Sequence, residues 1–141
     1  MDLLLHNTVA PAVNQIETHP FHQQVEIQQF LQKNGVQLES WGPFAEGRNH
    51  LFTNELLQNL AAKYQRSVAQ VVLRWLTQRG VVAIPKSVRA ERIAENFAIF
   101  DFELSAEDLA AIATLDTKAS VFFDHRDPAI VKWMSEVKFD L

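Results

Sequence analysis

The chain contains 141 residues, of which 48% are hydrophobic, and its formal net charge is −4. This length and composition predict one ordinary globular domain. The negative charge argues against a nonspecific nucleic-acid binder, because phosphate contacts need a basic face. The sequence contains no cysteine, which excludes disulfides and thiolate metal sites. It shows no signal peptide and no apolar run of membrane-spanning length, so we expect a cytoplasmic protein with no metal site and no membrane partner.

Strands and helices alternate along the chain. The expected elements are a helix at 1–5, a strand at 12–17, a helix at 23–33, a strand at 36–41, a loop at 42–50, helices at 54–64 and 67–78, a buried strand at 81–84, a helix after it, and a helix at 105–115. Gly35 and Gly80 are expected to end helices, and Ser67 and Ser105 to cap them. This alternation predicts an α/β protein whose parallel strands are joined by right-handed helical crossovers.

The loop after the third predicted strand is rich in groups that bind anions. Lys86, Arg89 and Arg92 place three cations within seven residues, and Ser87 offers a hydroxyl near a helix start. Charged hydrogen-bond donors at a helix start favour a phosphate. An alternative is that Ser87 is an ordinary N-cap and the cations are solvated.

Residues 84–96 resemble the coenzyme-binding signature of the aldo-keto reductase family. The resemblance implies that Lys86 lies beside the adenosine 2′-phosphate of NADP and that Ser87 and Val88 contact this phosphate. It also implies that Arg92 is the main cation, and an arginine can grip a phosphate through two hydrogen bonds while it stacks over a base. Arg89 would add charge, and the adenine edge would be bound by Glu95 and Asn96. NADPH is therefore the cofactor that the resemblance implies.

Two further loops match the family at the carboxyl ends of predicted strands, where barrel enzymes form their sites. The resemblance implies that Gln15 binds the nicotinamide carboxamide and that Trp41 stacks on the nicotinamide ring. Gly42 and Pro43 continue that loop, and the matching family loop that covers the pyrophosphate includes Phe44, Glu46 and Gly47. Taken alone, Gln15 reads as a solvent-facing strand residue and residues 41–43 as a turn.

The resemblance implies the carboxyl-terminal half of a (β/α)8 TIM barrel: strands six, seven and eight with their helices, an extra helix that begins with 104–108, and a tail. A whole barrel of this kind takes about 250 residues. Residues 1–116 would form the partial barrel with an NADP-binding half-site. Residues 117–141 would be a tail over the substrate mouth, where Phe122, Phe123, His125, Asp127-Pro128 and Trp133 either shape a carbonyl pocket or pack on the tail's own core.

Family members reduce a carbonyl with a hydride from the nicotinamide, while a tyrosine donates a proton with the help of a lysine, a histidine and an aspartate. Those four residues come from the first half of the family fold, and we find no match for them here. Tyr64, His19, His22 and His125 receive no catalytic or metal-binding role. The partial barrel would leave strand edges unpaired, so we expect association with a second copy or with a complementary half barrel.

Three hypotheses about function remain. The first is an NADPH-dependent carbonyl reductase whose catalytic half is supplied by another chain, or by upstream sequence if Met1 is an internal methionine. Aldehydes, glyoxals and diketo sugar acids are the substrates of the bacterial branch that the sequence resembles. The second is a catalytically inactive NADP-binding module, and the third is a structural or interaction remnant.

Overall fold

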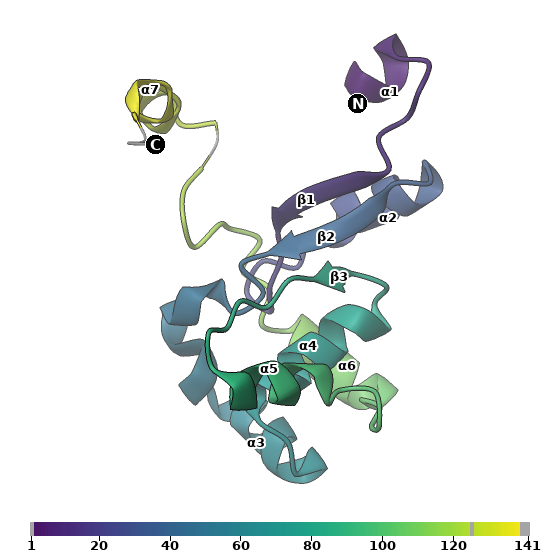
Figure 1. Ribbon diagram of the computed structural model, residues 1–141, viewed down its shortest axis with the longest axis vertical. Coiled ribbons are helices and arrows are strands. Elements are labelled where there is room, and N and C mark those ends of the chain that lie inside the picture. The colour runs from purple at the N-terminus through teal and green to yellow at the C-terminus, as the bar shows by residue number, and fades with distance from the viewer. Residues whose placement is uncertain (1, 125, 139–141) are drawn as a thin grey trace.

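The structure is a computed structural model that describes residues 2–124 and 126–138, and a parallel three-stranded sheet forms its centre (Figure 1). The strand order is β1-β2-β3, with Gln15 opposite Glu39 and Ser40 opposite Ala83. The strands are β1 Val13–Glu17, β2 Gln37–Trp41 and β3 Val82–Ala83. The predicted α/β architecture with parallel strands is therefore confirmed.

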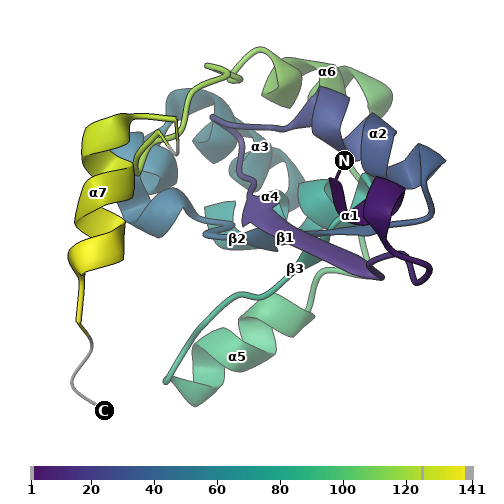
Figure 2. The same cartoon turned by 90° about the horizontal axis from the view of Figure 1, so that it is seen from above.

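Helices cover one face of this sheet. Figure 2 shows α2, α3, α4 and α6 on the same side of the strands. The helices are α1 Asp2–His6, α2 Val25–Lys33, α3 Glu55–Tyr64, α4 Val68–Gln78, α5 Ala90–Phe97, α6 Ala106–Ala113 and α7 Pro128–Glu136, and a kinked 3-10 segment, η1, covers Ala45–Thr53. The covered face carries Leu38 and Ser40 of β2, which are both buried.

The core lies between this covered face and the helices. The side chains of Val71, Val72, Trp75 and Leu76 recur at helical spacing on α4, and all four are buried. This pattern is the apolar stripe of an amphipathic helix. α4 is consequently the central helix of the packed layer, and it contacts α3, α5 and β3.

Local side-chain caps define where the helices begin. Ser67 accepts a hydrogen bond from the backbone N–H of Gln70, whose side chain bonds back to the Ser67 N–H in a capping box. At the starts of α3 and α6, the Asn54 and Ser105 side chains accept from the backbone N–H groups of Leu57 and Asp108, without the reciprocal bond. A cap of this kind satisfies backbone donors that have no partner within the helix. The predicted caps at Ser67 and Ser105 are confirmed.

The third strand is shorter and more exposed than the sequence predicted. The expected buried strand at 81–84 is only two residues long, and Val82 and Ile84 are 42% and 51% exposed. β3 is an edge strand that pairs only with β2 among the described residues. Val81 is only 2% exposed and Ala83 is half-buried. The prediction of a buried strand therefore holds for the side of residues 81–84 that faces the helices and is wrong for the side that carries Val82 and Ile84.

Three other boundaries differ from the predictions. α2 begins at Val25 rather than at 23, because Gln24 adopts a left-handed backbone conformation. The expected loop at 42–50 overlaps η1, and α5 begins at Ala90 with Arg89 rather than Ser87 at its N-cap. The tail contains helix α7, whose start is capped by Asp127 and favoured by a proline in the first turn. Of the tail residues singled out above, His125 lies outside the described residues.

A buried carboxylate ties α3 to α6. The Asp108 carboxylate accepts hydrogen bonds from the Lys63 ammonium at 2.7 and 2.9 Å, from the Ser105 hydroxyl at 3.0 Å and from the Tyr64 hydroxyl. Burial alone would raise the pKa of Asp108, but these donors outweigh it and lower the pKa to about 2. The Tyr64 hydroxyl also accepts from the Ser105 N–H, so it has a structural role.

We expect the substitution Tyr64→Phe to lower the free energy of unfolding by about 2 kcal/mol, because it removes a hydrogen bond to a buried charged group. The loss should be measured by urea unfolding at pH 7, well above the ordinary aspartate pKa of about 3.9, where Asp108 is ionised in both the folded and the unfolded chain. It should shrink as the pH falls toward 2 and Asp108 is protonated. Equal stability of the two proteins at pH 7 would contradict this role.

Candidate functional site

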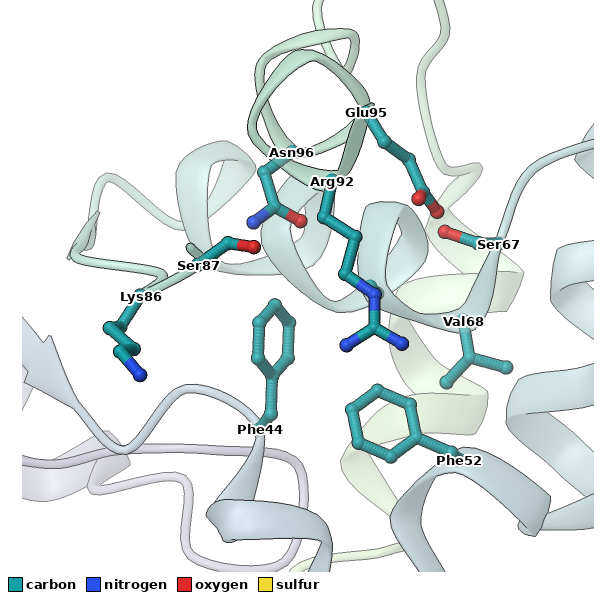
Figure 3. Close-up of a pocket in the computed structure, with 10 residues that line it drawn as sticks. Phe44, Phe52, Ser67, Val68, Lys86, Ser87, Arg92, Glu95 and Asn96 are labelled. Atoms are coloured by element: carbon teal, nitrogen blue, oxygen red, sulfur yellow. The ribbon is translucent and has the colours of Figure 1, made fainter. Parts of the chain in front are cut away.

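A cavity of about 420 Å³ lies where the β3–α5 connection faces α4 and η1 (Figure 3). Three separate parts of the chain line it: η1 with the residue before it, the start of α4, and the segment from the end of β3 into α5. The lining residues are Phe44, Phe52, Ser67, Val68, Ala69, Lys86, Ser87, Arg92, Glu95 and Asn96. The structure therefore brings together six of the predicted cofactor-binding residues.

Two cations and one carboxylate, Lys86, Arg92 and Glu95, line this cavity. Figure 3 shows Arg92 extending from α5 toward the rings of Phe44 and Phe52. Lys86 lies on the opposite side of the Phe44 ring. Within the described part of the chain, neither cation forms a hydrogen bond or an ion pair with another side chain. Two unpaired cations beside a hydroxyl and an amide form a site that fits a phosphate, and the two aromatic rings, 5.7 Å apart, offer flat apolar surface.

Helix α5 is positioned by polar contacts rather than by burial. None of its side chains is buried. The Gln70 side chain of α4 donates to the carbonyl oxygens of Glu95 at 3.2 Å and of Ala98 at 2.8 Å. These bonds hold the carboxyl end of α5, the helix that carries Arg92, against α4.

Among the predicted cofactor-binding residues that do not line this cavity are Val88, Arg89 and Glu46. Val88 is 82% exposed. Arg89 forms an ion pair with Glu91, with 2.5 Å between Nε and Oε1. Glu46 is exposed and lies 3.9 Å from Arg48. Their cofactor roles stay predictions, and the Arg89 pairing is a local reason why this cation is less available to an anion than Arg92.

A second cavity of about 750 Å³ lies at the carboxyl ends of β1 and β2 and is bounded by the tail. The lining includes Gln15, Glu17, Trp41 and residues 118–124 of the tail. The Gln15 amide donates to Glu39 at 2.7 Å, and the Trp41 ring lies 4.9 Å from that of Phe122. Gly42 has a φ of +62°, and a Cβ there would lie 3.5 Å from Phe122, while Pro43 is buried behind the loop.

Several residues of these cavities lie outside the motifs found in the sequence. Phe52, Ser67 and Val68 come to the first cavity from elements without a binding motif. Glu17 and His19, which received no role, are buried and hydrogen-bonded to each other at 2.8 Å. The sequence signal for this pair is a carboxylate and an imidazole two residues apart at the end of a strand. Buried ionisable groups need specific partners, so such a spacing indicates a pair.

The described residues contain neither a metal-binding cluster nor a helix that could span a membrane. No group of three or more His, Cys, Asp or Glu side chains in 2–124 and 126–138 is arranged to hold a metal ion. None of the described helices is long and apolar enough to cross a membrane.

Comparison with known proteins identifies the family. The profile of the Aldo/keto reductase family matches residues 1–117. The chain therefore belongs to the aldo/keto reductase family, as the resemblance in the sequence implied. It is 48% identical over 115 residues to the glyoxal reductase of Bacillus subtilis, which covers 82% of this chain and 41% of that protein. It is 43% identical over 116 residues to aldose reductase C of Dictyostelium discoideum, covering 82% and 36% respectively.

Solved structures show the same relationship. A variant of Gox0644 in complex with NADPH matches with a TM-score of 0.82 and 40% identity over 87% of this chain and 45% of that chain. An aldo-keto reductase of the silkworm Bombyx mori complexed with NADPH matches with a TM-score of 0.76 and 35% identity, over 84% and 39%. The chain thus spans less than half the length of these relatives, and its fold is part of an aldo-keto reductase barrel.

We expect the substitution Gln70→Ala to loosen α5. The variant loses two hydrogen bonds to α5, each worth about 1 kcal/mol, so the backbone amides of α5 should exchange with deuterium about fivefold to thirtyfold faster. Exchange in α3 should stay unchanged. Gln29→Ala, at an exposed position of α2, is the matched control. Unchanged exchange in α5 of the Gln70 variant would show that other contacts hold this helix.

Proposed function

We propose that this chain binds NADP(H) and that the first cavity holds its 2′-phosphate and adenosine. The observation that carries this proposal is that Lys86 and Arg92 both line this cavity and that neither is paired with a described side chain. Ser87 and Asn96 add a hydroxyl and an amide there, and the adenine would pack on the neighbouring aromatic rings. The relatives crystallised with NADPH support this assignment.

We further propose that the nicotinamide occupies the second cavity, beside Gln15 and Trp41. Both side chains line that cavity at the carboxyl ends of neighbouring strands. The Trp41 ring offers a flat surface that fixes which face of the nicotinamide is turned to the substrate, and the Gln15 amide can pair with a carboxamide. The loop from Gly42 to Gly47 connects the two cavities along the chain, and its place suits the pyrophosphate.

The reaction that we propose for the complete enzyme is the reduction of a small carbonyl compound to an alcohol. Bound NADPH supplies a hydride to the carbonyl carbon and leaves as NADP⁺, and the carbonyl oxygen takes up a proton. The proton donor would come from family sequence that this chain does not match, because the chain covers 41% of its glyoxal reductase relative. That relative and the related methylglyoxal reductases support aldehydes of the glyoxal type as substrates.

The uncovered face and edge of the sheet support an association. Val13, Val82 and Ile84 are apolar and between 42% and 51% exposed. Unpaired strand edges beside exposed apolar side chains favour pairing with another chain. We propose that this face is covered by a second copy or by the complementary part of a barrel.

The cofactor assignment predicts the effect of Arg92→Ala. The dissociation constant for NADPH should rise about 10- to 100-fold, because a charged hydrogen-bonded contact contributes about 1.5 to 3 kcal/mol. The constant for NADH, which has no 2′-phosphate, should change much less. Quenching of tryptophan fluorescence during titration measures both constants.

Lys33→Ala is the control, since it removes an exposed cation at the end of α2, where neither constant should change. An equal loss of NADPH and NADH affinity in the Arg92 variant would refute the 2′-phosphate assignment. NADPH binding without turnover of any aldehyde would instead identify the chain as a binding module.

Association can be tested by sedimentation velocity of the isolated chain. We expect dimers or larger species whose fraction grows with protein concentration. Replacement of Ile84 by Lys on the exposed edge should shift the population toward monomer. A compact, monodisperse monomer at all concentrations would count against the proposal.

A further inference from the structure

Glu17 lies at the carboxyl end of β1, where three donors converge on its buried carboxylate. The Ser120 hydroxyl donates to Oε2 at 2.5 Å, and the Val121 N–H donates to Oε1 at 3.0 Å. His19 Nε2 lies 2.8 Å from Oε1. Ser120 and Val121 belong to the tail, more than one hundred residues further along the chain, so this carboxylate joins the tail to the strand end.

The hydrogen bonds around His19 define its protonation. The Phe21 N–H donates to His19 Nδ1 at 3.2 Å, so Nδ1 carries no proton and Nε2–H is the donor to Glu17. Burial lowers the pKa of His19, and the nearby Glu17 carboxylate opposes this effect only in part. The net lowering of the pKa keeps the ring neutral at neutral pH. Burial would raise the pKa of Glu17, but the donors from Ser120, Val121 and His19 outweigh it and lower that pKa. The group is therefore an ionised carboxylate facing three donors.

The tail segment 120–123 is a compact turn on this anchor. The Ser120 hydroxyl oxygen accepts from the N–H groups of Phe122 and Phe123, both at 3.0 Å. Arg48 donates to the Val121 carbonyl at 3.0 Å, and its guanidinium lies 4.6 Å from the centre of the Phe122 ring. The turn thereby places Phe122 4.9 Å from the Trp41 ring, on the wall of the second cavity.

We propose that Glu17 is a positioning residue: through Ser120 and Val121 it fastens the tail to the end of β1 and thereby sets where Phe122 lies over Trp41. A buried carboxylate needs hydrogen-bond donors, and departure of the tail would remove two of its three. The tail is therefore most stable where Ser120 and Val121 contact Glu17. Any effect of Phe122 on a substrate in the second cavity rests on the proposed function. The contact of Glu17 with Ser120 and Val121 does not depend on it.

Hydrogen–deuterium exchange of the full chain without nucleotide tests the anchor. In Ser120→Ala, the amides of 121–123 should exchange at least about tenfold faster, because the loss of about 1.4 kcal/mol of protection has this effect. Ser120→Thr, which keeps the hydroxyl, should restore protection. Ser135→Ala, which removes an exposed tail hydroxyl bonded only to the Lys132 carbonyl, should leave 121–123 unchanged.

Glu17→Gln tests the other side of the contact. The substitution removes the charge and replaces one of the two acceptor oxygens by an NH2 donor. Residues 121–123 should therefore again exchange faster, while α3 and α4 stay protected. Faster exchange throughout the chain in both variants would overturn a positioning role, and so would unchanged exchange at 121–123. Titration of the same variants with NADPH and NADH distinguishes this proposal from the cofactor assignment. Both variants should still bind NADPH more tightly than NADH. If the unmodified chain shows no such preference, the cofactor assignment is refuted but the tail anchor is not.

Discussion

Parallel pairing of β1, β2 and β3 is the constraint on which both cavities depend. Because the strands run in one direction, the segments that follow them emerge at the same edge of the sheet. Gln15 and Trp41 are 26 positions apart in sequence, yet they line one cavity, and Lys86 follows the third strand at that same edge. The covering helices turn this edge into a fixed platform because α4 is buried along one full stripe.

Buried polar side chains connect the parts of the site. Gln70 joins α4 to α5, Glu17 joins β1 to the tail, and the Ser40 hydroxyl donates to the Thr18 carbonyl at 2.6 Å beside the strand ends. Each of these contacts is directional, and loss of one partner would leave a buried group unsatisfied. The apolar core positions the helices, and these polar contacts then orient the segments that carry the candidate binding residues.

The packing is uneven in a manner that agrees with the family relationship. The face of the sheet toward α2, α3 and α4 is buried, whereas the opposite face and the outer edge of β3 expose apolar side chains. α5 buries none of its side chains. Aldo-keto reductase relatives are more than twice as long as the matched region. In a closed barrel every strand pairs with two neighbours, so a strand such as β3 has no free edge.

The sequence by itself determined the order of the elements, the caps at Ser67 and Ser105, the family, and the proximity of Lys86, Ser87 and Arg92. These depend on local hydrogen bonds, on hydrophobic periodicity and on spacing within one short segment. Only the tertiary structure decided that Phe52 and Ser67 complete the first cavity, that Arg89 is paired, that β3 is exposed on one side, and that Glu17 holds Ser120. Those features depend on contacts between distant segments, and neither periodicity nor propensity specifies which distant side chains meet.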